Sequence, residues 1–217
     1  MRLGFLYAGQ GSQHPGMGQD LYDAYPAFRA VLDRAETDFD LKKLCFEGPA
    51  ETLNQTRYTQ PCMVAFAAGL TAVLREMGIA PDLAAGLSLG EYSALAAAGV
   101  FGDQEAISLT AFRGRVMEEA AAGRDSAMIA VLGLDREALQ EACREAEPLG
   151  TVVIANYNCP GQLVLGGDRE AVKKAADLAK TKGARRCVPL RVSGPFHTPL
   201  TVSYTHLRAH ETLSDLV

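Results

Sequence analysis

The segment that most constrains the fold is Gly86-Leu-Ser-Leu-Gly90, a G-x-S-x-G pattern. It follows a short apolar run of strand length, residues 83–87, and leads into an Ala-rich stretch, residues 89–98, with the composition of a helix. A strand that passes directly into a helix makes a crowded turn, so small residues are needed on both sides of the serine. The pattern therefore predicts an α/β fold in which Ser88 is exposed at a strand-to-helix turn.

Ser88 could play either of two parts at this turn. Unpaired N–H groups and the helix dipole favour negative charge at a helix N-terminus, so the N–H of Leu89 would stabilise an oxyanion formed by a Ser88 nucleophile. Alternatively, Ser88 only caps the Ala-rich helix. The position of the pattern between a strand and a helix favours the nucleophile.

A glycine-rich loop, Gly9-Gln-Gly-Ser-Gln13, follows the first apolar strand, residues 3–7. It is not a dinucleotide fingerprint, because His14 stands where a third glycine is required, and it lacks the Gly-Lys-Ser/Thr of a Walker loop. A backbone N–H of such a turn can point into a site, which makes Gln10 a candidate second oxyanion donor. An ordinary loop is the alternative.

A serine nucleophile needs a base, and the chain has four histidines. His197 is the strongest candidate, since prolines two residues to either side would stiffen its loop; the alternative is a solvated loop residue. His14, beside the glycine loop, is weaker. His206 and His210 have helical spacing but no third ligand, so we predict no metal site.

Arg113 is the informative charge. In a helix predicted from Asp103 to about Ala122, it falls on the apolar stripe, whereas Arg115 points away. A guanidinium on that stripe needs an anion. A buried ion pair with a local carboxylate and a clamp on a substrate carboxylate both remain open.

A polar break at residues 123–126 separates the first half of the chain from the second. Beyond it, the patterns predict strands over 127–134, 151–156, 162–165 and 185–192, with helices over 135–146 and 168–182. Asp135 and Asp168 are expected to cap these helices. The resulting β-α-β-β-α-β order is that of the split βαβ, ferredoxin-like arrangement.

Composition limits the partners and the location. With 21 Lys+Arg against 26 Asp+Glu in 217 residues, the net charge is −5, which argues against a binder of nucleic acid or of an anionic membrane. The longest apolar stretch, residues 62–74, falls short of the roughly 18 residues of a spanning helix. The five scattered cysteines form no Cys-x-x-Cys pair and are expected to be reduced. We therefore expect a cytoplasmic location.

Several motifs occur in a fixed order along the chain. They are Gly9–Gln13, Thr59-Gln-Pro61, Gly86–Tyr92, Arg113-Gly-Arg115, Asn156–Gly161 and Gly194–His197. Through them the chain, as far as Leu200, resembles the malonyl-CoA:acyl carrier protein transacylases of fatty-acid synthesis. The resemblance implies an incomplete α/β-hydrolase-like large subdomain over residues 1–125, an inserted ferredoxin-like α+β small subdomain over 126–193, and a return to the large subdomain over 194–200.

The resemblance also implies a role for each candidate residue. Ser88 would be the nucleophile and His197 its base, Gln10 and Leu89 would donate the oxyanion N–H pair, and Arg113 would bind the malonyl carboxylate. The substrates would be malonyl-CoA and the phosphopantetheine thiol of acyl carrier protein, joined by ping-pong transfer through a malonyl-serine without a cofactor. A monomer is expected.

Four further positions are weighed through the same resemblance. Phe196 resembles the malonyl-selective form of its loop. Gln60 and Asn158 resemble pocket-lining positions, with backbone capping in turns as the alternative for both. Leu87 stands where many family members carry histidine and others carry leucine, and we attach no loss of activity to it.

Two other functions stay open: a serine esterase or thioesterase on the same turn, and an inactive fragment that binds a carrier protein. The second arises because the resemblance stops after Leu200. Residues 202–212 resemble a translated sequencing adapter, so residues 201–217 are expected to be a non-native tail of a truncated gene product.

Overall fold

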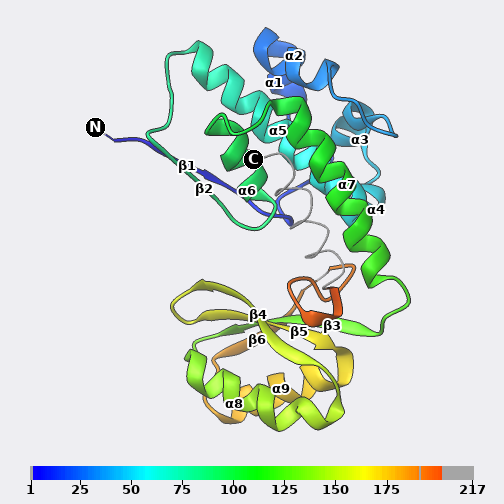
Figure 1. The fold of residues 1–217 in the computed structure, drawn as a ribbon, viewed down its shortest axis with the longest axis vertical. Coiled ribbons are helices and arrows are strands. Elements are labelled where there is room, and N and C mark those ends of the chain that lie inside the picture. The colour runs from blue at the N-terminus through cyan, green and yellow to red at the C-terminus, as the bar shows by residue number, and fades with distance from the viewer. Residues whose placement is uncertain (1, 191, 202–217) are drawn as a thin grey trace, which may run out of the picture. The chain divides into compact units, whose positions relative to one another are not determined.

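The computed structural model describes residues 2–190 and 192–201 of an α/β chain (Figure 1). Its internal contacts define two units, Met1–Val116 and Met117–Val217. The division falls inside helix α7 (Asp103–Ala121), whereas the sequence places it after that helix. Gly194–Thr201 groups with the second unit, and the predicted return of residues 194–200 to the large subdomain stays a prediction. The predicted tail lies outside the described residues from position 202 onward.

The first unit combines a pair of parallel strands with helices. The strands are β1 (Gly4–Tyr7) and β2 (Leu83–Gly86); the helices are α1 (Gln19–Ala24), α2 (Pro26–Asp33), α3 (Leu41–Glu47), α4 (Ala50–Leu53), α5 (Thr56–Glu76), α6 (Gly90–Ala97) and the first part of α7. Tyr7 pairs with Gly86 at the end of the two strands. Because parallel strands end at the same edge, the loops that follow β1 and β2 lie side by side.

The predicted strand-to-helix passage and the helix predicted from Asp103 are confirmed. Apolar residues at helical spacing also predict helices over residues 25–38 and 59–77. Helix α5 confirms the second of these, whereas α2 ends at Asp33 and is shorter than predicted. A reason is visible just beyond its end, where the Thr37 hydroxyl donates to the Phe39 carbonyl at 2.7 Å. Threonine hydroxyls that bond nearby backbone groups compete with helix formation.

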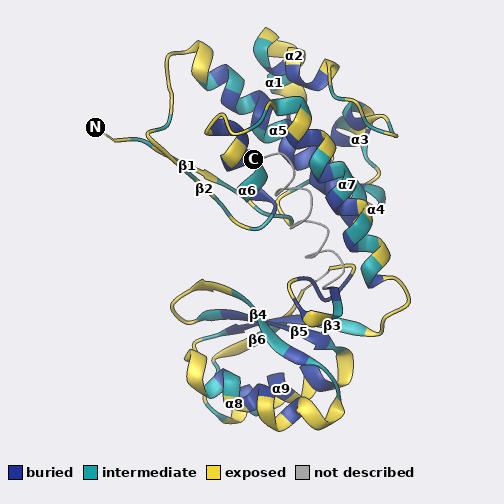
Figure 2. Cartoon of the chain, in the orientation of Figure 1, coloured by how far each residue is buried: buried dark blue, intermediate teal, exposed yellow. Residues whose placement is uncertain are grey.

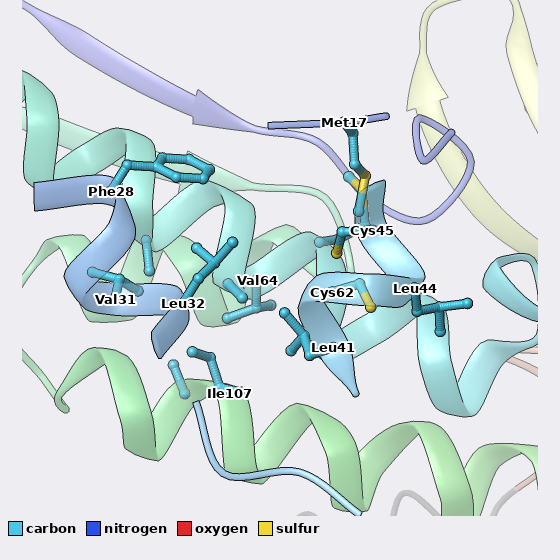
Figure 3. Packing of buried hydrophobic residues seen from close by; sticks show 14 of the residues in the cluster. Met17, Phe28, Val31, Leu32, Leu41, Leu44, Cys45, Cys62, Val64 and Ile107 are labelled. Carbon is cyan, nitrogen blue, oxygen red and sulfur yellow. The ribbon is translucent and has the colours of Figure 1, made fainter. Parts of the chain in front are cut away.

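The core of the first unit forms around α5 (Figure 3). Phe28 of α2 is fully buried and lies so close to α5 that a Cβ at Gly69 would be 2.7 Å from its ring. The Phe66 ring meets Phe28 edge-on, with ring centroids 5.8 Å apart. Burying a side chain of this size stabilises a fold by about 1.5–3 kcal/mol. Ile107 of α7 is also fully buried in this cluster, which ties the first part of α7 to this unit.

The second unit is an antiparallel sheet with two helices packed on it (Figure 1). Its elements are β3 (Ser126–Leu132), α8 (Arg136–Ala146), a 3-10 turn (Glu147–Leu149), β4 (Val152–Cys159), β5 (Gln162–Asp168), α9 (Arg169–Thr181), β6 (Arg186–Pro189) and a 3-10 turn (Pro199–Thr201). The strands lie in the order β4-β5-β3-β6. The predicted β-α-β-β-α-β order is confirmed.

The two aspartates predicted to cap α8 and α9 behave differently. Asp135 accepts a hydrogen bond from the Ala138 N–H at 2.8 Å and caps α8 as expected. Asp168 occupies the N-cap position of α9 but makes no side-chain capping bond. Its carboxylate instead accepts from the Thr151 N–H at 2.7 Å, at the start of β4. The predicted N-cap position of Asp168 is therefore confirmed, but the side-chain capping bond is absent because Oδ2 accepts from Thr151, just before β4.

Burial differs sharply between the helical core and the β1–β2 sheet (Figure 2). Leu6 and Leu83 are 86% and 68% exposed, and the pairing register places them on one face of that sheet. Within residues 2–190 and 192–201, none of the helices has the length and apolar character needed to span a bilayer.

Candidate active site

Ser88 lies in a strained turn between β2 and α6. Its φ angle is 53°, in the left-handed region that non-glycine residues adopt at an energetic cost. Leu89 takes the N-cap position of α6, so Ser88 is one residue before that position. The N–H of Gly90 donates back to Leu87 and that of Glu91 to Ser88, at 2.9 and 3.2 Å, which closes the turn. The predicted strand-to-helix turn is confirmed, but Ser88 is half-buried in it and not exposed.

Both glycines of the pattern are required by close backbone contacts. A Cβ at Gly86 would lie 2.0 Å from the carbonyl of Gly90, and a Cβ at Gly90 would lie 2.3 Å from the carbonyl oxygen of Tyr7. The glycine loop after β1 also touches this turn, since a Cβ at Gly9 would be 2.9 Å from the Leu87 oxygen. The turn therefore has no room for larger residues, as the sequence predicts.

Arg113 brings a buried positive charge to Ser88. Its side chain is only 3% exposed, and its Nη2 donates to the Ser88 Oγ at 3.1 Å. Its Nη1 donates to the Gln60 Oε1 at 2.7 Å, and its Cζ lies 5.5 Å from the centroid of the Tyr92 ring. A guanidinium in this position favours negative charge on or near the serine oxygen.

The start of α5 supports both Arg113 and the glycine loop. Gln60 is fully buried within α5, so the alternative that it caps a turn is wrong; its amide oxygen holds Arg113 instead. One helical turn earlier, the Thr56 Oγ1 accepts from the Gln10 Nε2 at 3.2 Å. Helix α7 comes close to the start of α5 at Gly114. A Cβ on Gly114 would lie 2.7 Å from the backbone carbonyl oxygen of Thr56.

Sequence reasoning missed Thr56 and Tyr92. Each lies four residues from a predicted site residue, Thr56 before Gln60 and Tyr92 after Ser88. Residues four apart share one face of a helix, so this spacing could have found Thr56 from Gln60 within α5. Ser88 lies before the N-cap of α6, so helical spacing is no such signal for Tyr92. The structure thus gathers Ser88, Gln60 and Arg113 in the first unit, with Gln10 linked to them through Thr56.

Three predicted residues belong to the second unit. His197 is exposed and, like Ser88, has a positive φ, here 60°. The Phe196 side chain is 6% exposed, and its N–H donates to the Gly194 oxygen at 3.0 Å. The Thr198 hydroxyl donates to the Pro195 oxygen at 2.5 Å, so short turns fix the loop on both sides of His197.

Asn158 is exposed in strand β4, at a shift in the β4–β5 register between Tyr157 and Cys159. Its alternative role as a turn cap is therefore wrong. His14 is exposed, with its Nδ1 3.0 Å from the Pro15 oxygen. Across the described part of the chain, no three His, Cys, Asp or Glu side chains are grouped to hold a metal ion, and positions 206 and 210 fall outside it.

Residues 4–217 match the family model described as the acyl transferase domain. The chain belongs to the acyl transferase domain family. The match includes both the Ser88 turn and the His197 loop.

Two curated relatives of the chain share one name. The chain is 44% identical over 202 residues to the malonyl CoA-acyl carrier protein transacylase of Bacillus subtilis (strain 168). The aligned residues cover 92% of this chain and 64% of that protein. The Escherichia coli (strain K12) protein of the same name is 41% identical over 202 residues, covering 92% and 65%. The chain thus spans slightly less than two thirds of these relatives' length.

Two solved structures resemble the chain over 99% of its length. The crystal structure of MCAT from Streptococcus pneumoniae has a TM-score of 0.89 and 46% identity, covering 99% of this chain and 70% of that one. A second structure is described as a type II PKS acyl-carrier protein in complex with its malonyl-transacylase. It has a TM-score of 0.93 and 40% identity, with coverage of 99% and 70%.

Proposed function

We propose that this acyl transferase moves a malonyl group from malonyl-CoA to the phosphopantetheine thiol of an acyl carrier protein in fatty-acid biosynthesis. The observation that carries the proposal is the 3.1 Å hydrogen bond from the buried Arg113 to Ser88. A malonyl thioester ends in a free carboxylate, and a guanidinium beside the nucleophile suits that group. The names of the curated relatives, and the solved transacylase with its carrier protein, support the same substrate and partner.

The acylation half-reaction would use Ser88, His197 and two N–H groups. His197 accepts the hydroxyl proton while the Ser88 Oγ attacks the thioester carbonyl carbon. The N–H groups of Gln10 and Leu89 hold the oxyanion of the tetrahedral intermediate. The carbon–sulfur bond then breaks, CoA leaves with the proton from His197, and malonyl-serine remains. Arg113 holds the malonyl carboxylate throughout.

The second half-reaction reverses these roles. The phosphopantetheine thiol gives its proton to His197 and attacks the ester carbonyl of malonyl-Ser88. The carbon–oxygen bond breaks, and Ser88 recovers the proton from His197. Atoms and charges balance with the two substrates alone, so the residues need no cofactor for this chemistry.

Selectivity and architecture complete the proposal. Phe196 would favour malonyl over branched acyl groups, and Asn158 would line the pocket. The first unit would be an α/β-hydrolase-like body, which its parallel strands and strand-to-helix turn support. The second would be a ferredoxin-like insert, supported by its strand order. The cytoplasmic location stays a proposal, and it agrees with the five free cysteines within the described residues.

Intact-mass measurement after incubation with malonyl-CoA tests the proposed intermediate. The wild-type chain should gain one malonyl group, and Ser88→Ala should gain none. Circular dichroism on both chains serves as the folding control. An absence of adduct on folded wild-type chain would contradict the proposal and favour a fragment that only binds the carrier protein.

Steady-state transfer tests the role of Arg113. Arg113→Ala should reduce malonyl transfer to the carrier protein at least tenfold more than acetyl transfer, because only malonyl carries the free carboxylate. Equal losses for the two acyl groups would exclude the carboxylate clamp. Release of free malonate at the rate of CoA release would instead identify an esterase.

A further inference from the structure

We infer that Tyr92 is a positioning residue that holds the Arg113 guanidinium in the orientation needed for the malonyl carboxylate. The inference rests on the proposed function and deepens it. Part of the selectivity for malonyl would then depend on the uncharged ring of Tyr92, which belongs to α6 and contacts the Arg113 guanidinium.

Three neighbouring side chains hold the Arg113 guanidinium. Hydrogen bonds to Gln60 and Ser88, at 2.7 and 3.1 Å, restrain the guanidinium through its Nη1 and Nη2 atoms. Both bonds act roughly in the plane of the group. The Tyr92 ring, 5.5 Å from Cζ, supplies a contact of a different kind, between the cation and the electron-rich ring face.

Burial makes this contact strong. Arg113 is only 3% exposed, so water screens the interaction little. Cation–π contacts are stronger at desolvated sites than at exposed ones. An arginine without this ring would keep its two in-plane bonds but would have more freedom to tilt away from Ser88.

Tyr92 is itself fixed relative to the nucleophile. It lies four residues after Ser88, and its N–H donates to the Leu89 oxygen at 3.1 Å in the first turn of α6. Its ring also packs against Phe101, with centroids 6.4 Å apart and an interplanar angle of 40°. The helix that begins at the serine turn therefore also carries the ring that holds the clamp.

The substitutions Tyr92→Phe and Tyr92→Leu separate the ring from the hydroxyl. Tyr92→Phe should keep the ratio of malonyl to acetyl transfer within about twofold of wild type. Tyr92→Leu should raise the KM for malonyl-CoA roughly tenfold, while acetyl transfer changes less than about twofold. The matched control is Phe112→Leu, the same kind of ring loss beside Arg115, where the ring lies 5.6 Å from the Arg115 Cζ.

Fluorinated phenylalanines at position 92 test the inference without loss of shape. Added fluorine weakens the negative ring face, so the KM for malonyl-CoA should rise stepwise with fluorine number. Parallel losses of malonyl and acetyl transfer, an unchanged ratio in Tyr92→Leu, or a Tyr92→Phe defect equal to that of Tyr92→Leu would overturn it. Failure of the proposed function appears separately, as an absence of malonyl transfer by the wild-type chain.

Discussion

Backbone strain marks the two residues proposed to exchange a proton. Among residues 2–190 and 192–201, Ser88 and His197 are the two non-glycine residues with positive φ, at 53° and 60°. Such conformations cost about 1–3 kcal/mol each and persist where the surrounding structure enforces them. At Ser88 the enforcement comes from the backbone contacts of Gly86 and Gly90.

The glycine contacts give a stability prediction. Gly86→Ala should destabilise the chain by more than about 3 kcal/mol, because its Cβ would overlap the Gly90 backbone at 2.0 Å. Urea unfolding followed by circular dichroism measures the change. Gly102→Ala is the control, since a Cβ there meets nothing within 4 Å. If the unfolding free energy of the Gly86→Ala chain lies within about 1 kcal/mol of the wild-type value, the turn can widen and the prediction is wrong.

The contact between Gln10 and Thr56 gives a second prediction. Thr56→Val keeps the shape but removes the acceptor for the Gln10 amide, so the loop proposed to donate to the oxyanion should loosen. Malonyl and acetyl transfer should fall together, by about fivefold, the factor that corresponds to ~1 kcal/mol for one hydrogen bond. Thr56→Ser should retain activity. A change in the ratio of malonyl to acetyl transfer would mean that Thr56 also affects carboxylate binding by Arg113, and would contradict a role limited to the Gln10 loop.

Residue patterns predicted the positions of Ser88 and Arg113, but not the side-chain contacts that hold Arg113 in place. The crowded Ser88 turn and the placement of Arg113 on an apolar stripe are both local consequences of sequence. The bond between Arg113 and Gln60 joins positions 53 apart, and no local pattern specifies it. The contact of Tyr92 with Arg113 likewise depends on how α6 and α7 pack.

At the scale of elements, hydrophobic periodicity predicted the long helices and the βαββαβ order. It did not single out α1, α3 and α4, which have 6, 7 and 4 residues. Elements this short contain too few turns to establish a helical period. Tertiary contacts hold them, as in α3, where Leu41, Leu44 and Cys45 are buried in the first-unit core.

Asp33, at the end of α2, links that helix to α1 and α3 and predicts a pH effect. It accepts from Lys42 of α3 at 2.6 Å and from Tyr22 of α1 at 2.7 Å, and the Lys42 bond is the main reason that its pKa lies below the ordinary value. A lowered folded-state pKa adds stability above the unfolded pKa, and that stability is lost as the pH falls through the folded pKa.

Asp33→Asn should therefore destabilise the chain at pH 7, by no more than about 1 kcal/mol because the pair is partly exposed. The difference in unfolding free energy between wild type and Asp33→Asn should shrink as the pH falls below the ordinary pKa of an aspartate and through the lowered pKa of Asp33. Urea unfolding at a series of pH values measures it, with the exposed Asp23→Asn as the matched control. A deficit that is the same at every pH would assign the effect to packing.

At the scale of the whole molecule, the β1–β2 sheet departs from the usual burial of parallel strands. Parallel sheets are normally covered on both faces, yet Leu6 and Leu83 are mostly exposed on one face here.

Leu6→Thr combined with Leu83→Thr should lower the fluorescence of a hydrophobic dye bound to the chain. Stability should change by less than about 0.5 kcal/mol per site. Leu149→Thr, an exposed leucine of the second unit, is the control, and equal dye binding in all chains would contradict this.

The division inside α7 has a consequence for limited proteolysis. Arg115 is exposed close to the boundary between the units, but helical hydrogen bonds hold its backbone away from a protease. Arg124 is exposed in the polar loop just after the helix, outside regular secondary structure, where proteases cut more readily. Trypsin should therefore cut first after Arg124, giving fragments whose ends lie in the loop and do not match the boundary between the two units.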